Sequence, residues 1–488
     1  MTDTTPGSEQ FTKGLQDLAN GLRACKDHRL HRDITLALFF LKAINDIFQS
    51  YSTLGPSLAN KYPSWQGLLE KLRVPEEAVF SKLFDQRMEL GNGERLNAAL
   101  QALAKAYTPF NEVFQEINCN SPRLGNEQER DELLAKLLDT LNFITVEVPP
   151  RHSGYFDMLG QGFTYLLRHF AGKYGRTSGD IVPPPEVVDL LKCLLAPKPG
   201  DEICDPACFS GSLLSELGMA QHFIYGQERD RGAWALARMN LFLHGCDSSK
   251  IELGDTIADP KLLSGATELK KFDIVVSNLM TIPEDWGAEG ADADPFKRFS
   301  RGVPLKNLGE YGYIQHMVAC MKPDTGRMAV IVPRGVLSRG GTDTAIRQKL
   351  IEEDRLAAVI CLPKKLFLGA IIPVAVLVLS NCKAEKDKVL FIDASQDFQL
   401  GKNRNILRKE DIERIGNSYR MMQEIEAWSH VTSETEIKNN DFNLNMPHYV
   451  QMSSENGLLD IEQIGRERKE LLMERVDLEK KIDQLLNI

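Results

Sequence analysis

The sequence predicts an α/β protein in three parts: an N-terminal helical domain (1–150), a doubly wound, mostly parallel α/β domain (151–450) and a C-terminal helix (451–488). Apolar residues recur at helical spacing in the first and last parts. In the middle part, short apolar strands alternate with helices. Such alternation is typical of a parallel sheet that carries helices on both faces.

The two ends of the chain are predicted to be helical. In the N-terminal part, apolar residues lie three or four positions apart within 34–48 and 133–141, and no cluster of catalytic residues is present. A hinge is expected at 146–153, which holds two consecutive prolines. The C-terminal stripe from Ile461 to Leu485 has Arg at two positions, which disfavours a free-standing coiled coil. It is expected to dock against another helix, in this subunit or in a partner.

The middle part is predicted to form a sheet of short strands. Strands are expected at 202–205, 222–227, 251–254, 272–277, 328–332, 356–362, 374–379 and 389–392. Helices are expected from Ser212, at 231–244 and at 313–321. Because ligands bind at the carboxyl ends of the strands in such a sheet, the loops after the strands are the expected binding regions.

The composition is that of an ordinary cytoplasmic protein. Its 488 residues include 43% hydrophobic and 26% charged ones, and the net charge of -10 argues against nonspecific wrapping of DNA. The nine Cys form no CxxC pair, which predicts reduced thiols. Cys204 and Cys208 are expected to be small buried residues, so no metal site is predicted. The longest apolar stretch, 371–379, is half a membrane span, and no membrane association is expected.

The loop after the first strand, 205–212, reads Asp-Pro-Ala-Cys-Phe-Ser-Gly-Ser and opens a helix. In nucleotide and S-adenosylmethionine sites this loop is rich in glycine, because the backbone turns tightly and the ligand lies against it. Asp205, Ala207 and Gly211 are the candidate cofactor-binding residues. Phe209 is expected to fill ligand space with its side chain. The alternative interpretation is a strand-to-helix turn in a fold that binds no cofactor.

An acidic residue follows each of the next two strands. Glu228 stands about twenty residues after the loop, where an acid can hydrogen-bond a ribose. Asp255 could face an adenine amino group. Either acid alone could equally cap the helix that follows it. Because the two acids come in this order after successive strands, they favour a cofactor site.

Asn278 follows the buried strand at 272–277 and is the candidate catalytic residue. Methylation of adenine N6 or cytosine N4 uses Asn or Asp followed by Pro-Pro and an aromatic residue, whereas Leu279, Met280 and Thr281 follow here. The target base has to be flipped out of the duplex and held by stacking and hydrogen bonds. Thr281 cannot stack, and losing an aromatic platform costs roughly 1–3 kcal/mol per base. Asn278 is therefore interpreted as the remnant of a base clamp.

Several further segments carry a family resemblance. They are Gly-Gln-Glu at 226–228, Leu-Ala-Arg-Met-Asn-Leu at 236–241, His-Gly at 244–245, and the segments 299–304, 326–327, 332–333, 335–341, 346–347, 362–363, 366–367, 401–407 and 440–444. With these segments the chain resembles, over nearly its whole length, the modification (M) subunit of type I restriction-modification systems. That family consists of adenine-N6 DNA methyltransferases.

The resemblance implies a Rossmann-like S-adenosylmethionine-dependent methyltransferase fold for the middle part. It implies that the N-terminal helices help to clamp double-stranded DNA and that the C-terminal helix meets a specificity (S) subunit. A second M subunit and a restriction (R) subunit are the further partners that it implies. By the same resemblance, the cofactor is S-adenosylmethionine if the chain is active, and otherwise none.

The chain departs from the family pattern at three places. The family's first motif has glycines where Phe209 and Ser212 stand, and its cofactor lid has two aromatic residues and a Thr where this chain has Ile-Val-Pro at 181–183. The third departure is at 279–281. Since cofactor pocket, lid and base clamp are all altered, the first interpretation is a pseudoenzyme: an M-type subunit in phage defence that keeps the fold for DNA and partner binding. The alternatives are an active adenine-N6 methyltransferase and an assembly protein that binds an S-like subunit without touching DNA.

Overall fold

The computed structural model describes residues 8–21, 27–54, 70–144, 155–178, 181–218, 222–246, 249–282, 285–383 and 385–451. In these ranges, helices precede the first strand and strands then alternate with helices, as the sequence predicts. The predicted hinge at 146–153 and the predicted C-terminal helix lie outside the described residues. The hinge, that helix and the domain boundaries therefore stay predictions.

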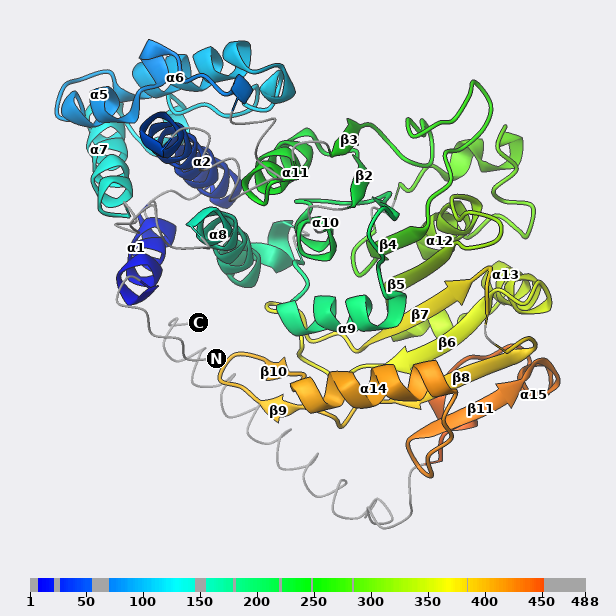
Figure 1. The fold of residues 1–488 in the computed structure, drawn as a ribbon. Helices are drawn as coiled ribbons and strands as arrows, with labels where there is room; N and C mark the ends of the chain where they lie inside the picture. Colours follow the sequence, from blue (N-terminus) through cyan, green and yellow to red (C-terminus); the bar gives the residue numbers. More distant parts are fainter. Residues whose placement is uncertain are drawn as a thin grey trace, which may run out of the picture.

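The N-terminal helices form a layer to one side of the sheet (Figure 1). They are α1 (Ser8–Asn20), α2 (His28–Leu54), α5 (Phe80–Asp85), α6 (Asn92–Ala106), α7 (Glu127–Phe143) and α8 (Tyr155–Ser178). The start of α7 is a capping box: the Asn126 side chain accepts a hydrogen bond from the Glu129 N–H, and the Glu129 carboxylate accepts one from the Asn126 N–H. The helices predicted within 34–48 and 133–141 are confirmed as parts of α2 and α7.

A nine-stranded sheet occupies the centre of the described α/β region. Its order is β11-β8-β6-β7-β5-β4-β1-β2-β3, where the strands are β1 (Glu202–Asp205), β2 (Phe223–Glu228), β3 (Lys250–Leu253), β4 (Ile274–Asn278), β5 (Arg327–Pro333), β6 (Leu356–Cys361), β7 (Val374–Ser380), β8 (Lys388–Asp393) and β11 (Ser429–Ser433). Only the pairs that involve β7 or β11 are antiparallel, so the predicted mostly parallel sheet is confirmed. The eight predicted strands are all present.

Three short strands were not predicted. The edge strand β11 reads Ser-His-Val-Thr-Ser and lacks the apolar run of a buried strand. A separate hairpin consists of β9 (Gln399–Leu400) and β10 (Asn405–Ile406), which pair antiparallel. Each of its strands has two residues, too few for a periodic pattern.

Helices cover both faces of the sheet, as in a doubly wound fold (Figure 1). One face carries α9 (Pro185–Leu195), α10 (Ser212–Leu217), α11 (Arg231–Leu243) and α14 (Lys409–Met421), and the other carries α12 (Glu310–Ala319), α13 (Thr342–Glu352) and α15 (Glu434–Asn439). Alternate strand residues point to opposite faces, so Ile274 and Val276 enter the first core and Val275 enters the second. The first core also contains the buried residues of the N-terminal helices, which therefore pack directly on the α/β region.

The topology determines where a ligand can bind. The strand order reverses between the neighbouring parallel strands β1 and β4, because the chain continues to β2 and β3 on one side and to β5 on the other. In an open α/β sheet, the crevice for a ligand lies at the carboxyl ends of the strands at this switch point. Asp205 ends β1 and Asn278 ends β4. Two residues that the sequence singled out separately therefore lie at the same crevice.

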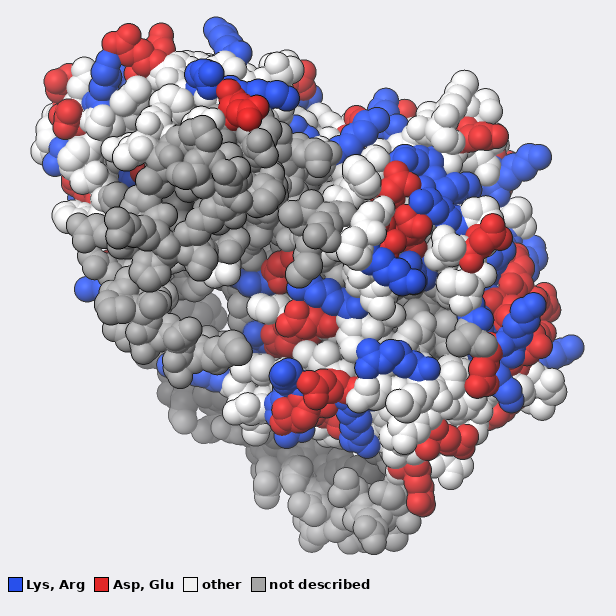
Figure 2. Space-filling model, in the orientation of Figure 1, with Lys and Arg blue, Asp and Glu red and all other residues white. Residues whose placement is uncertain are grey.

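Charged side chains of both signs are interspersed over the part of the surface that Figure 2 displays as described residues. On this face, Lys and Arg lie among Asp and Glu rather than in a continuous basic stripe. Within the described ranges, no helix combines the length and apolar character that a membrane span requires. The same ranges contain no group of three or more His, Cys, Asp or Glu side chains placed to hold a metal ion. Cys204 and Cys208 are buried, as predicted.

Candidate functional site

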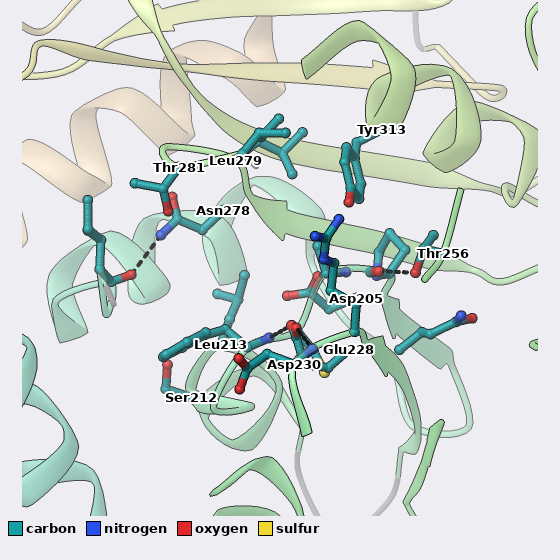
Figure 3. A pocket seen from close by; sticks show the side chains of 18 of the residues that line it. Asp205, Ser212, Leu213, Glu228, Asp230, Thr256, Asn278, Leu279, Thr281 and Tyr313 are labelled. Atoms are coloured by element: carbon teal, nitrogen blue, oxygen red, sulfur yellow. Dashed lines mark hydrogen bonds between the residues drawn. The ribbon is translucent and has the colours of Figure 1, made fainter. Parts of the chain in front are cut away.

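A pocket of about 350 Å³ opens at the switch point (Figure 3). It brings together residues from separate parts of the sequence: Asp205, Ala207 and Phe209 after β1, Glu228 at the end of β2, Asn278, Leu279 and Thr281 at the end of β4, and Ile181 and Pro183 from the predicted cofactor lid. In Figure 3, Asn278 and Thr281 lie toward one end of the pocket, and Thr256 and Tyr313 lie toward the other.

The loop after β1 keeps the backbone of a glycine-rich loop although Phe209 replaces a glycine. Phe209 has a φ of 48°, in the left-handed region that costs a side-chain-bearing residue about 1–2 kcal/mol. Gly211 has a φ of 67°, and a Cβ there would lie 3.2 Å from the Cα and Cβ of Ala237. The Cys208 N–H donates to the Gln227 carbonyl (3.1 Å), which holds the loop against β2. The local fold is retained, and Phe209 lines the pocket.

Asp205 lies at the floor of the pocket. Its side chain is buried, and its Oδ1 accepts a hydrogen bond from the Ala207 N–H (3.0 Å). Burial raises the pKa of Asp205 from 3.8 to about 7, because little solvent reaches the charged form. A cationic ligand in the pocket would stabilise the ionised carboxylate and lower this pKa again.

Glu228 is held by two backbone amides. Its Oε2 accepts from the Phe209 N–H (2.9 Å) and its Oε1 accepts from the Asp230 N–H (2.8 Å). Burial raises the pKa of Glu228, and the two amides act in the opposite direction. The carboxylate therefore has a defined orientation at the end of β2, and each oxygen retains a lone pair for a ribose hydroxyl.

Asp255 is placed differently from the other candidate residues. Its Oδ1 accepts from the N–H groups of Ile257 and Ala258, and its Oδ2 lies 3.3 Å from the Arg229 Nη1. The pocket wall at this position is formed by Thr256, whose hydroxyl donates to the Pro206 carbonyl. Asp255 thus holds the turn that positions Thr256, and its contact with an adenine stays a prediction.

The lid segment, residues 181–183, orients the side-chain amide of Asn278. Its Nδ2 donates to the Ile181 carbonyl at 2.9 Å, which leaves Oδ1 on the other side of the amide plane. This Oδ1 is buried and has no hydrogen-bond partner among the described residues. A buried acceptor without a partner is rare in folded proteins, so the geometry favours a donor from a ligand at this position.

The three residues after Asn278 change the loop. The Leu279 N–H donates to the Ile331 carbonyl (2.9 Å), which extends the β4–β5 pairing by one residue; a proline at position 279 has no N–H and could not make this bond. Leu279 is 2% exposed and Met280 is 5% exposed. Thr281 lines the pocket. A short hydroxyl side chain thus occupies the wall where the family pattern has an aromatic ring.

The lid segment is anchored from two further elements. Arg168 of α8 donates to the Pro183 carbonyl (3.4 Å) and pairs with Glu216 of α10. Arg404, beside β10, pairs with Glu186 in the first turn of α9. Together with the bond from Asn278 to Ile181, these contacts hold the segment 181–186, from which Ile181 and Pro183 line the pocket.

Several lining residues were not predicted from the sequence. Arg29 comes from α2 and Tyr313 from α12, while Arg229 and Thr256 are next to the acids that were predicted. Burial raises the pKa of Tyr313, so its hydroxyl stays protonated near Glu228 and Asp255. Arg229 and Thr256 could have been found by extending the search one residue beyond each predicted acid, Glu228 and Asp255. Arg29 and Tyr313 lie in helices, and nothing in the helical pattern of the sequence marks them as residues of a site.

Comparisons with known proteins identify the family. The N-6 DNA methylase family matches residues 155–457, and the HsdM N-terminal domain family matches residues 11–141. The type I restriction enzyme MjaVII methylase subunit of Methanocaldococcus jannaschii is 29% identical, with 99% of this chain and 83% of that protein covered. The type I restriction enzyme MpnII methylase subunit of Mycoplasma pneumoniae is 25% identical, with 85% and 81% covered.

A solved structure agrees with this result. The crystal structure of the type I restriction-modification system methyltransferase subunit from Streptococcus thermophilus superposes with a TM-score of 0.76 and 28% identity, and the match covers 91% of this chain and 100% of that one. The modification subunit of a putative type I restriction enzyme from Vibrio vulnificus has the same fold, with a TM-score of 0.62 and 18% identity. The chain belongs to the N-6 DNA methylase family, among the methylase subunits of type I restriction-modification systems.

Proposed function

We propose that this chain is an M-type subunit of a type I restriction-modification-like DNA defence complex in which methyl transfer is lost or severely impaired. On this proposal the methylase fold serves to bind double-stranded DNA and partner subunits in the cytoplasm. The observation that carries it is the wall at the end of β4, where Thr281 lines the pocket and Leu279 is hydrogen-bonded into the sheet.

The chemical reason concerns the flipped base. A target adenine has to be held so that its amino nitrogen meets the methyl donor, and stacking supplies roughly 1–3 kcal/mol per base. Thr281 has no ring to stack on the base. A misplacement of about 1 Å can cost on the order of a hundredfold in rate. Loss of the ring together with a changed loop therefore leaves methyl transfer much slower than in a subunit with Pro-Pro and an aromatic residue.

The cofactor side of the pocket supports the same proposal. S-adenosylmethionine is the methyl donor that the family implies, and Asp205, Ala207, Gly211 and Glu228 are the residues proposed to hold it if it binds. Phe209 lines the pocket where the family pattern has a glycine. On the proposal, Phe209 occupies volume that the cofactor needs.

The first test measures cofactor binding to the purified full-length chain by isothermal titration calorimetry. We expect no binding of S-adenosylmethionine in the micromolar range for the natural sequence. Phe209→Gly removes the side chain from the pocket and suits the left-handed φ, so it should recover binding at least in part. Micromolar binding to the natural sequence would contradict the proposal. If Phe209→Gly gains no affinity, the obstruction lies instead at residues 181–183.

A second candidate function is an active, site-specific adenine-N6 DNA methyltransferase. One observation favours it: the Asn278 Oδ1 is buried without a partner among the described residues, as an acceptor for an adenine amino group would be. Methylated adenine in DNA from cells that make this chain with its S subunit would establish this activity. The matched variant Asn278→Ala, which lacks the acceptor, should then abolish the mark.

The partners on this proposal are an S subunit, a second M subunit and an R subunit. The relatives are named as subunits of type I restriction enzymes, and one structural neighbour was solved in a study of complex assembly of the type I system. The C-terminal segment 461–485, with its apolar stripe, is proposed to dock the S subunit. Co-purification with an S subunit, lost when Leu471 and Leu478 are replaced by Asp, would test this contact.

A further inference from the structure

Arg29 reaches the cofactor pocket from a different part of the chain than the other lining residues. It lies in the first turn of α2, within the range matched by the HsdM N-terminal domain family, whereas the pocket is built on the sheet. Its Nη1 lies 3.4 Å from the Asp230 Oδ2, and the two side chains are 55% and 39% exposed. The ion pair therefore stands at the rim of the pocket and crosses from the N-terminal helices to the start of α11.

Asp230 connects this ion pair to the site itself. Its Oδ1 accepts from the Ala233 N–H (2.9 Å) and so caps α11, while its own N–H donates to the Glu228 Oε1 (2.8 Å). The other oxygen of Glu228 accepts from the Phe209 N–H. A continuous series of polar contacts thus leads from Arg29 through Asp230 and Glu228 to the loop after β1.

Contacts away from the pocket join the N-terminal region to α11. Arg231 lies 2.9 Å from the Glu112 carboxylate and 3.1 Å from the Gln115 Oε1. Arg238 donates to the Pro109 carbonyl (2.9 Å). The rings of Phe40 and Phe242 meet edge to face, with centroids 5.5 Å apart. The position of Arg29 therefore depends on how α2 and its neighbours dock on α11.

We propose that Arg29 makes the N-terminal helical domain part of the cofactor pocket, so that docking of this domain and occupancy of the pocket are linked. The ligand class is one with a hydroxyl pair that can hydrogen-bond the Glu228 carboxylate. This rests on the proposed function only in taking the pocket as the family's cofactor site, and not on whether the natural sequence binds S-adenosylmethionine. Because linkage is reciprocal, a ligand that binds Glu228 or Asp230 changes the stability of the docked domain, and docking changes the affinity of the ligand. A domain that is expected to clamp DNA would in this way respond to the state of the pocket.

The first experiment needs no ligand, so it does not depend on the proposed loss of cofactor binding. Hydrogen–deuterium exchange is measured on the full chain for the natural sequence, Arg29→Ala and Lys82→Ala. Each variant removes one exposed ion pair, but the Lys82–Glu76 pair lies within the N-terminal region, whereas Arg29 pairs with Asp230 and lines the pocket. We expect Arg29→Ala to speed exchange about two- to fivefold in peptides covering 205–212 and 228–233, the range for one exposed ion pair. Lys82→Ala should leave 205–212 unchanged, and Arg29→Lys should restore slow exchange.

The second experiment measures the linkage with S-adenosylmethionine as the probe. The Kd is compared between Arg29→Ala and Lys82→Ala. If the natural sequence shows no binding by calorimetry, both variants are made in the Phe209→Gly background. A two- to fivefold change is expected only for Arg29→Ala. If no variant binds the probe, the exchange experiment alone decides. Equal exchange at 205–212 in the two Ala variants overturns the linkage whatever the outcome of the cofactor titration. If a variant binds S-adenosylmethionine but Arg29→Ala leaves exchange at 205–212 unchanged, the linkage is overturned. Binding of S-adenosylmethionine by the natural sequence would separately contradict the proposed loss of cofactor binding.

Discussion

Replacing Arg298 with Ala is expected to lower the free energy of unfolding by about 3–5 kcal/mol, the usual cost of breaking a buried ion pair. Arg298 and Asp294 are each 3% exposed at their side chains, and their nearest charged atoms lie 2.7 Å apart. The guanidinium also donates to the carbonyls of Thr256 (3.0 Å) and Ile257 (2.7 Å). Alanine would leave the Asp294 carboxylate and both carbonyls buried without these partners.

His316 belongs to the same buried cluster as Arg298 and Asp294. Its Nδ1 lies 3.1 Å from the Arg298 Nη1. Burial, together with the nearby Arg298 charge, lowers the pKa of His316 to about 3, so the imidazole is neutral at physiological pH and can accept this hydrogen bond. The cluster thus fixes the carbonyls of the consecutive residues Thr256 and Ile257, and with them the position of Thr256 in the pocket wall.

Urea unfolding of the full chain, followed by circular dichroism, measures this prediction. Lys306→Ala is the control, because the Lys306 and Glu289 side chains of this ion pair are 68% and 85% exposed, and exposed pairs contribute about 0–1 kcal/mol. A destabilisation by Arg298→Ala no larger than that of the control would show that the buried pair is not a major source of stability.

Replacing Asp205 with Asn is expected to raise the free energy of unfolding at pH 8 by about 2–4 kcal/mol. The pKa of Asp205 is raised in the folded state from 3.8 to about 7 by burial. Between these two pH values the folded state binds more protons than the unfolded state. The contribution of Asp205 to the free energy of unfolding therefore falls as the pH rises. Asn cannot ionise, and its amide oxygen can still accept from the Ala207 N–H.

The pH profile distinguishes this effect from a general change in packing. The difference between Asp205→Asn and the natural sequence should be small at pH 4 and should grow up to about pH 8. Asp273→Asn is the control with the opposite sign, because the Lys322 ammonium and the Glu202 N–H hold the pKa of Asp273 below its usual range. Asp273→Asn should therefore destabilise at neutral pH, with the loss fading in acid. A constant difference for Asp205→Asn would contradict the role of its ionisation.

Much of the fold could be predicted because strand periodicity is a local property. The first strand has the predicted bounds, and Asp205 and Asn278 meet because carboxyl ends of parallel strands share one edge of the sheet. The edge strand β11 could not be predicted, since pairing with β8 rather than an apolar pattern keeps it in the sheet. The sequence showed that Thr281 and Phe209 depart in residue type from the family pattern. Only the structure showed that both residues line the same pocket.

The sequence by itself determined the order of helices and strands, the family, and the residue types that stand in the cofactor loop and after Asn278. Only the tertiary structure decided which side chains meet. The Ile181 carbonyl orients Asn278, Arg298 holds the turn at Thr256, and Arg29 joins Asp230 at the pocket rim. These contacts join residues far apart in the chain, and they depend on how helices pack on the sheet. A local pattern of apolar and polar residues reports which face of a helix is buried but not which partner it meets.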